Sequence, residues 1–216
     1  MKMKIVQCWD DGVTADIRLM DILRKYNAKA SFNICAGNHD RKRKHSWNFK
    51  DTEVWALGLD EMPDAYSGFV IASHSLTHPR LEKIPIEKAT RDIVHGRERL
   101  QKIFRQEVLG FAYPFGGYNE AVKDAIRKAG HLYARTCVMT DFPFPPKDPM
   151  EFHPNCHFLA PDFWGRYEKA KEKGVFYFWG HSYELITEEM WEAFDNQIQR
   201  IHDDPEVEWC NLPDLF

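Results

Sequence analysis

Strand-like and helix-like patterns alternate along nearly all of the 216-residue chain. Apolar runs predict strands at residues 3–9, 29–35, 68–73, 108–113, 132–138, 175–179 and 207–210. Apolar residues at three- and four-residue spacing predict helices at residues 14–26, 85–105, 118–129, 161–172 and 187–202, with Thr14 and Thr187 as caps. This alternation indicates parallel strands joined by helical crossovers, and therefore an α/β fold.

The length fits one domain, and we expect residues 1–216 to form it. A hydrophobic fraction of 44% and an aromatic fraction of 14% are typical of a globular chain with a sizeable core. Residues 37–66 are irregular, charged and aromatic, which indicates an insertion over one face of the domain. A short helix is predicted within it, near residues 52–59.

Charge and hydropathy exclude several kinds of partner. The formal net charge is -4 with both signs interspersed, which argues against nucleic acid. No apolar run approaches the roughly 20 residues of a membrane span, and no signal peptide is visible, so we expect a cytoplasmic protein. The five cysteines are expected to be reduced thiols. The sequence leaves open whether the chain forms a homo-oligomer.

Four polar motifs follow predicted strands, at residues 10–12, 73–79, 113–117 and 180–182. Because the chemistry of parallel α/β folds lies at the carboxyl ends of their strands, these motifs predict a single site.

The first two motifs carry metal-ligand residues. His74 and His78 are four residues apart, a spacing that on a helical turn places both imidazoles on one face. Asp11 from another strand end would complete a set of two histidines and one carboxylate, as in catalytic metal sites that keep a position open for water. A divalent cation would also relieve the repulsion between Asp10 and Asp11, and would leave Asp10 beside the bound water.

The motifs together resemble those of the polysaccharide deacetylase family, also called the NodB-homology or carbohydrate esterase family 4. They read, in order, Asp10-Asp11-Gly12, His74-Ser75-Leu76-Thr77-His78, Phe111-Ala112-Tyr113-Pro114-Phe115-Gly116 and Gly180-His181-Ser182. The resemblance covers residues 5 to about 210. It implies a distorted (β/α) barrel with about seven parallel strands.

The resemblance also implies a role for each matching residue. Asp11, His74 and His78 would bind a divalent metal, usually zinc, with cobalt, nickel or manganese as alternatives. Asp10 would be the general base, and His181 the general acid. The implied activity is removal of an acetyl group from an N-acetylated sugar or polysaccharide by metal-bound water. The backbone N–H of Phe115 would help to hold the oxyanion.

The sequence departs from the family pattern at two places. Ala112 stands where many members have an arginine that pairs with the base, and we expect Arg135 on a neighbouring strand to replace it, with Arg80 as the alternative. The family's Asp and Trp of the fourth motif have no clean match. The candidates are Asp141, Asp148 and Trp164, so the group that orients His181 stays open.

Further aromatic and polar residues are candidates for the substrate cleft, namely Tyr113, Pro114, Trp179 and Tyr183. His153 and His157 flank Pro154, and we interpret them as loop and strand packing rather than as metal ligands. Two alternatives to an acetyl-sugar hydrolase remain. One is hydrolysis of another C–N amide, such as a ureide or cyclic imide, and the other is a carbohydrate-binding member without catalysis.

Overall fold

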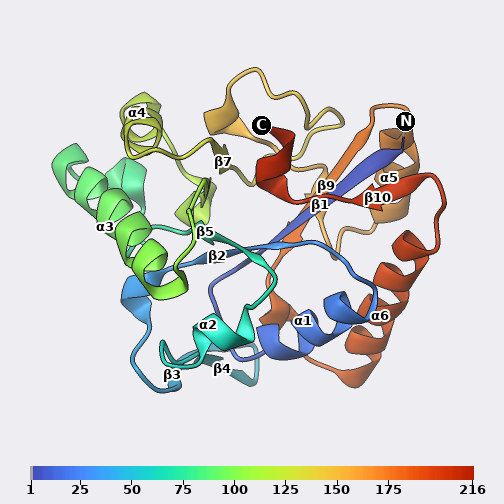
Figure 1. The fold of residues 1–216 in the computed structure, drawn as a ribbon, viewed down its shortest axis with the longest axis horizontal. Coiled ribbons are helices and arrows are strands. Elements are labelled where there is room, and N and C mark those ends of the chain that lie inside the picture. Colours follow the sequence, from blue (N-terminus) through green and yellow to red (C-terminus); the bar gives the residue numbers. More distant parts are fainter. Residues whose placement is uncertain (1) are drawn as a thin grey trace.

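Parallel strands form one sheet at the centre of the molecule, in a computed structural model that describes residues 2–216 (Figure 1). Seven strands follow one another in the order β7-β6-β5-β2-β1-β9-β8, and β10 pairs with β1. The strands are β1 (Met3–Asp10), β2 (Ser31–Ile34), β5 (Val70–Ser73), β6 (Gly110–Ala112), β7 (Tyr133–Arg135), β8 (Cys156–His157), β9 (Val175–Gly180) and β10 (Val207–Trp209). This seven-strand path is a half-barrel, so the predicted distorted barrel of parallel strands is confirmed.

Helices surround the sheet, with α3 and α4 on one side and α5 and α6 on the other (Figure 1). The helices are α1 (Asp16–Lys25), α2 (Met62–Ala65), α3 (Ile86–Phe104), α4 (Glu120–Lys128), α5 (Phe163–Lys171) and α6 (Glu188–His202). Thr187 caps α6 by accepting the N–H of Met190, as predicted. The cap predicted at Thr14 is wrong, because α1 begins after Ala15 and has no side-chain cap.

The strand β1 is the centre of the core. It is buried along nearly its whole length, as expected of a parallel strand with neighbours on both sides. The fully buried Trp9 packs edge-on against Phe158 and Phe194, with ring centroids 4.9 and 5.3 Å apart. The carboxyl end of β1 is therefore held rigidly where the two aspartates follow. Within residues 2–216, every helix is too short or too polar to cross a bilayer.

The segment 37–66 differs from its prediction. It contains an antiparallel hairpin, β3 (Lys44–Phe49) and β4 (Thr52–Ala56), so the short helix expected near residues 52–59 is wrong. The reason is local, because Val54 and Ala56 alternate with exposed neighbours, which is the period of a strand. Lys50 adopts a positive φ of 52° and closes the turn.

Candidate active site

The carboxyl ends of the strands surround a cavity of about 260 Å³. Its lining residues are Asp10, Asp11, His74, His78, Tyr113, Phe115, Arg135, Cys137, Trp179, His181 and Tyr183. The four sequence motifs thus meet at one place. Of the catalytic, metal-binding and substrate-binding residues assigned from the sequence, Pro114 does not line the cavity, because it is buried in the turn after β6.

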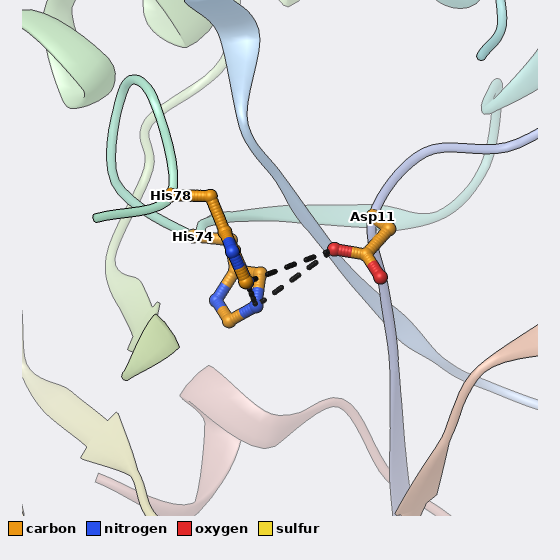
Figure 2. A group of neighbouring side chains, drawn as sticks. All are labelled: Asp11, His74 and His78. Carbon is orange, nitrogen blue, oxygen red and sulfur yellow. Dashed lines mark hydrogen bonds and ion pairs between the residues drawn. The ribbon is translucent and has the colours of Figure 1, made fainter. Parts of the chain in front are cut away.

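Asp11, His74 and His78 point toward one another (Figure 2). The Nε2 atoms of the two histidines are 3.1 Å apart, and Oδ1 of Asp11 is 4.0 Å from each. Donors around a tetrahedral zinc are about 3.3 Å apart, given bonds of about 2.0–2.2 Å. The three donors therefore surround a position that a small cation could fill with slight adjustment of Asp11.

The protonation of the two histidines suits metal binding. Nδ1 of His74 lies 2.8 Å from the carbonyl oxygen of Ala112 and donates its proton there, which leaves the lone pair on Nε2. Burial and the facing His74 lower the pKa of His78 to about 4, so its ring is neutral at pH 7. The two Nε2 atoms, 3.1 Å apart, need a proton or a cation between them. Asp11, His74 and His78 therefore fit a divalent metal ion.

The histidine segment is an irregular loop, so its two histidines converge without the helical turn on which their spacing would place them on one face. Ser75 and His78 both have positive φ, at 66° and 59°. The Ser75 hydroxyl accepts the N–H of His78, and Asp92 on α3 accepts the N–H of Leu76. Gly96 lets α3 approach closely, since a Cβ there would lie 2.8 Å from backbone atoms of Ser75. The loop is therefore fixed by its contacts with α3.

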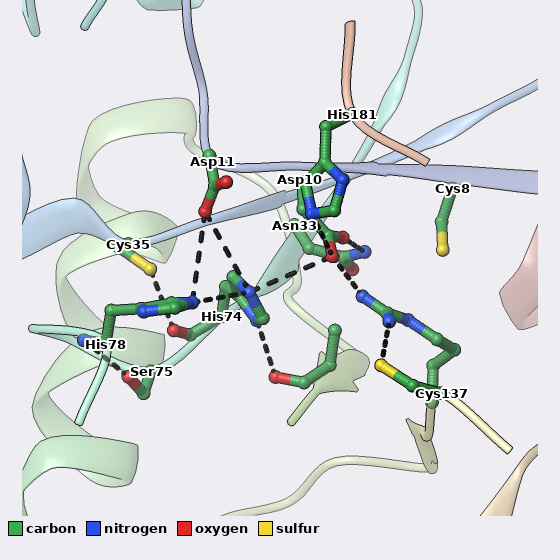
Figure 3. Close-up of polar contacts among 12 residues, drawn as sticks. Cys8, Asp10, Asp11, Asn33, Cys35, His74, Ser75, His78, Cys137 and His181 are labelled. Carbon is green, nitrogen blue, oxygen red and sulfur yellow. Dashed lines mark hydrogen bonds and ion pairs between the residues drawn. The ribbon is translucent and has the colours of Figure 1, made fainter. Parts of the chain in front are cut away.

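Asp10 is buried beneath these ligands, with 2% of its surface exposed. Its Oδ1 accepts a hydrogen bond from the side-chain amide of Asn33 at 2.7 Å (Figure 3). Its Oδ2 is paired with the guanidinium of Arg135. Burial by itself would raise the pKa of Asp10, but Arg135, the two nearby histidines and the Asn33 hydrogen bond together outweigh it and hold the pKa well below its usual range. Asp10 is therefore a fixed carboxylate.

Arg135 occupies the position beside Asp10 that the sequence left open at Ala112. It comes from the end of β7 and is fully enclosed, with its guanidinium 4.4 Å from the Trp179 ring. The alternative, Arg80, lies instead over the ring of Phe115, at 4.4 Å.

His181 follows β9 and faces Asp10, with 3.8 Å between its Nε2 and Oδ2 of the carboxylate. Its other ring nitrogen, Nδ1, lies 3.2 Å from Oε2 of Glu184, which also accepts the His181 backbone N–H. Burial alone would lower the pKa of His181, but the bond to Glu184 and the nearby Asp10 raise it. His181 therefore keeps its proton to a higher pH than a free imidazole does.

The fourth-motif candidates lie elsewhere. Asp148 is paired with Lys123, Asp141 lies 3.3 Å from Arg166, and Trp164 lies under Arg200. Glu184 holds His181 instead, and sequence reasoning missed it. The only sequence signal for Glu184 was its position three residues after His181.

Asn33 was also missed, and so was Cys137. Asn33 is the second-last residue of β2 and stands directly beside Asp10 in the register of the sheet, so its place near a strand end was the signal. Cys137 lies two residues after Arg135, whose Nη1 is 3.4 Å from its sulfur, and no sequence pattern marked it.

The remaining predicted residues form the walls. Phe115 is 57% exposed at the mouth and has a positive φ of 57°. Tyr183 packs beside His181, with ring centroids 5.0 Å apart. Tyr113 is buried, and its hydroxyl donates to the Met150 carbonyl, so its ring belongs to the core more than to the cavity surface.

Fold and donor set together define an α/β barrel with a candidate metal site at the carboxyl ends of its strands. The family model described as polysaccharide deacetylase matches residues 1–134. The chain belongs to the polysaccharide deacetylase family. A search of curated proteins finds no match.

Solved structures share the fold at low sequence identity. The Streptococcus pyogenes deacetylase PplD, determined with acetate, is 23% identical with a TM-score of 0.51, over 61% of this chain and 55% of PplD. The Xyl-CE4 domain of a xylanase from the hindgut metagenome of Trinervitermes trinervoides is 16% identical with a TM-score of 0.65, over 100% of this chain and 90% of that one. A mutant of a CE4 family pseudoenzyme with restored activity is 15% identical with a TM-score of 0.62, over 99% and 67%.

Proposed function

We propose that the protein is a divalent-metal-dependent hydrolase that removes the acetyl group from an N-acetylated carbohydrate. One observation carries the proposal. A three-donor group, a buried carboxylate and a carboxylate-bound histidine line a single cavity. Membership of a deacetylase family supports the same conclusion.

Asp11, His74 and His78 would hold the metal, and zinc suits a set of two imidazoles and one carboxylate. When bound, the cation supplies Lewis-acid chemistry, since it acidifies water and polarises a carbonyl oxygen. Cobalt, nickel and manganese remain compatible with the same donors.

The protein's own side chains supply the acid–base chemistry. Asp10 accepts the proton of the water that attacks the acetamide carbon. Its pairing with Arg135 and Asn33 keeps the carboxylate ionised and fixed in direction, so it is a weak base whose contribution depends on placement. The backbone N–H of Phe115 is the proposed donor to the developing oxyanion.

His181 completes the reaction by protonating the leaving nitrogen. An amine is a poor leaving group unless it is protonated, so the C–N bond breaks only with an acid beside it. Glu184 holds the ring through Nδ1, which leaves Nε2 directed toward Asp10 and the cavity. The raised pKa of His181 keeps this acid protonated to higher pH.

The test is acetate release from a panel of N- and O-acetylated sugars, with and without a chelator. The proposal predicts turnover that the chelator stops and that added zinc restores. His181→Ala should lower kcat by about a hundredfold or more, in line with the loss of a general acid. Turnover that survives the chelator, or turnover of ureides or imides with no acetylated sugar accepted, would contradict it.

A further inference from the structure

One carboxylate oxygen, Oε2 of Glu184, is shared by two histidines. It lies 3.2 Å from Nδ1 of His181 and 2.9 Å from Nε2 of His157. The same atom accepts the backbone N–H of His181 at 3.1 Å. Burial would raise the pKa of Glu184, but these two histidines outweigh it and lower the pKa to about 2. Glu184 is thus ionised, and its Oε2 lies within hydrogen-bond distance of three nitrogen atoms.

A second contact of His157 identifies which of its ring nitrogens carries the proton. The backbone N–H of Leu159 lies 3.3 Å from Nδ1 of His157 and donates to it. Nδ1 is then an acceptor, so the proton of the neutral ring is on Nε2. His157 therefore donates to Glu184 through Nε2.

The ring of His157 is held by the sheet. His157 belongs to β8 and pairs in register with Trp179 on β9. The Trp179 ring lies edge-on to both histidines, with centroids 4.9 Å from His157 and 5.4 Å from His181. A strand residue with these contacts is a rigid donor, whereas Glu184 lies on the short turn after His181.

We propose that His157 is a positioning residue for His181 and acts through Glu184. Its Nε2–H fixes the direction of the Glu184 carboxylate, and that carboxylate keeps a proton on Nδ1 of His181 in both the neutral and the charged ring. His181 then presents Nε2 to the cavity, and the charged ring donates its proton from there. The effect on turnover rests on the proposed function, whereas the effect on the tautomer does not.

The same three side chains could instead jointly bind a metal ion, since their donor atoms lie within 4.8 Å of one another. A metal would need the lone pair of Nε2 on His157, where the contact with Leu159 places a proton. The geometry therefore favours the hydrogen-bonded chain.

The experiment compares His157→Met with His157→Gln. The two side chains are of similar size, but only glutamine can donate a hydrogen bond to Glu184. The first readout is the ¹⁵N NMR signature of the His181 ring in the metal-free protein, at a pH above the pKa of His181 where the ring is neutral. We expect the Nδ1–H tautomer in the wild type, a mixture of tautomers in His157→Met, and recovery in His157→Gln.

The second readout is steady-state kinetics on an acetylated sugar. We expect His157→Met to lower kcat about tenfold with little change in KM, and His157→Gln to recover most of the loss. Equal tautomers and equal kcat in the two variants would overturn the proposal. So would the loss of one bound zinc equivalent in His157→Met, since that would show a metal site. If no substrate is turned over, the tautomer result still decides the role of His157.

Discussion

At the residue scale, the burial of a charged pair is the feature with the largest energetic consequence. Asp10 and Arg135 are 2% and 1% exposed, and each is the charge partner of the other. Removing one member of such a pair leaves the other charge buried without compensation, at a cost of about 3–5 kcal/mol.

We therefore expect Arg135→Met to lower the free energy of unfolding by about that amount. Introducing Asp10→Asn into the same variant should restore part of the lost stability, because a neutral amide then replaces the unpaired buried carboxylate. Urea unfolding of the metal-free wild type, both single variants and the double variant gives the four free energies of unfolding that make up a double-mutant cycle. Strictly additive losses would show that the pair is not coupled.

At the element scale, the hairpin of β3 and β4 supports one wall of the cavity. Trp47 and Phe49 on β3 pack edge-on against Tyr183, with ring centroids 5.3 and 5.1 Å away. The sequence marked this segment as an insertion, and the contacts show that it reaches the cavity wall beside His181.

Replacing Trp47 and Phe49 by alanine should raise KM for an acetylated sugar roughly five- to tenfold, because an aromatic pair contributes about 0.5–1.5 kcal/mol. The effect on kcat should be smaller, since neither residue touches the proposed base or acid. Trp55→Ala is the matched control, because Trp55 is 40% exposed on β4 and its indole bonds Glu53. A fall in kcat at constant KM would contradict this role.

At the scale of the whole molecule, Asp16 connects three parts of the fold. It is fully buried at the start of α1 and accepts hydrogen bonds from Tyr66, at the end of α2, and from Ser182, in the turn after β9. Burial raises the pKa of Asp16 to about 7, although both hydrogen bonds and the backbone of Val13 oppose the shift and Asp11 adds to it.

The raised pKa means that the folded state holds a proton that the unfolded state releases between pH 4 and 7. The stability contributed by this proton is complete below the unfolded pKa and is lost as the pH rises through the folded pKa. Relative to Asp16→Asn, the wild type should be more stable at pH 5 than at pH 8 by about 2–3 kcal/mol. Chemical unfolding of both proteins at the two pH values measures this, and an equal difference at both would refute it.

The architecture and most of the cavity could be predicted from the sequence, because periodicity determines strand and helix and parallel strand ends converge. Asp11, His74 and His78 followed from that convergence. Conformations that depend on tertiary contacts could not be predicted. The loop of His74 and His78 looks helical by spacing, but its hydrogen bonds to Asp92 and the approach of α3 keep it irregular.

Contacts between segments that are distant in the sequence could not be predicted either. Glu184 and His157 meet only because β8 lies beside β9, and β8 has just two residues, too few for a pattern. The hairpin was missed because its alternation is short and its aromatic residues also suit a helix. The Glu184–His157 contact thus depends on a partner remote in the sequence, whereas the hairpin depends on a local pattern.

We propose that the two adjacent aspartates have separate tasks, with Asp11 binding the metal and Asp10 accepting the proton. Bound zinc and acetate release in Asp10→Asn and Asp11→Asn test this assignment. We expect Asp10→Asn to keep one zinc equivalent while acetate release falls about a hundredfold or more. We expect Asp11→Asn to lose the zinc. Loss of zinc in Asp10→Asn with zinc retained in Asp11→Asn would contradict the assignment.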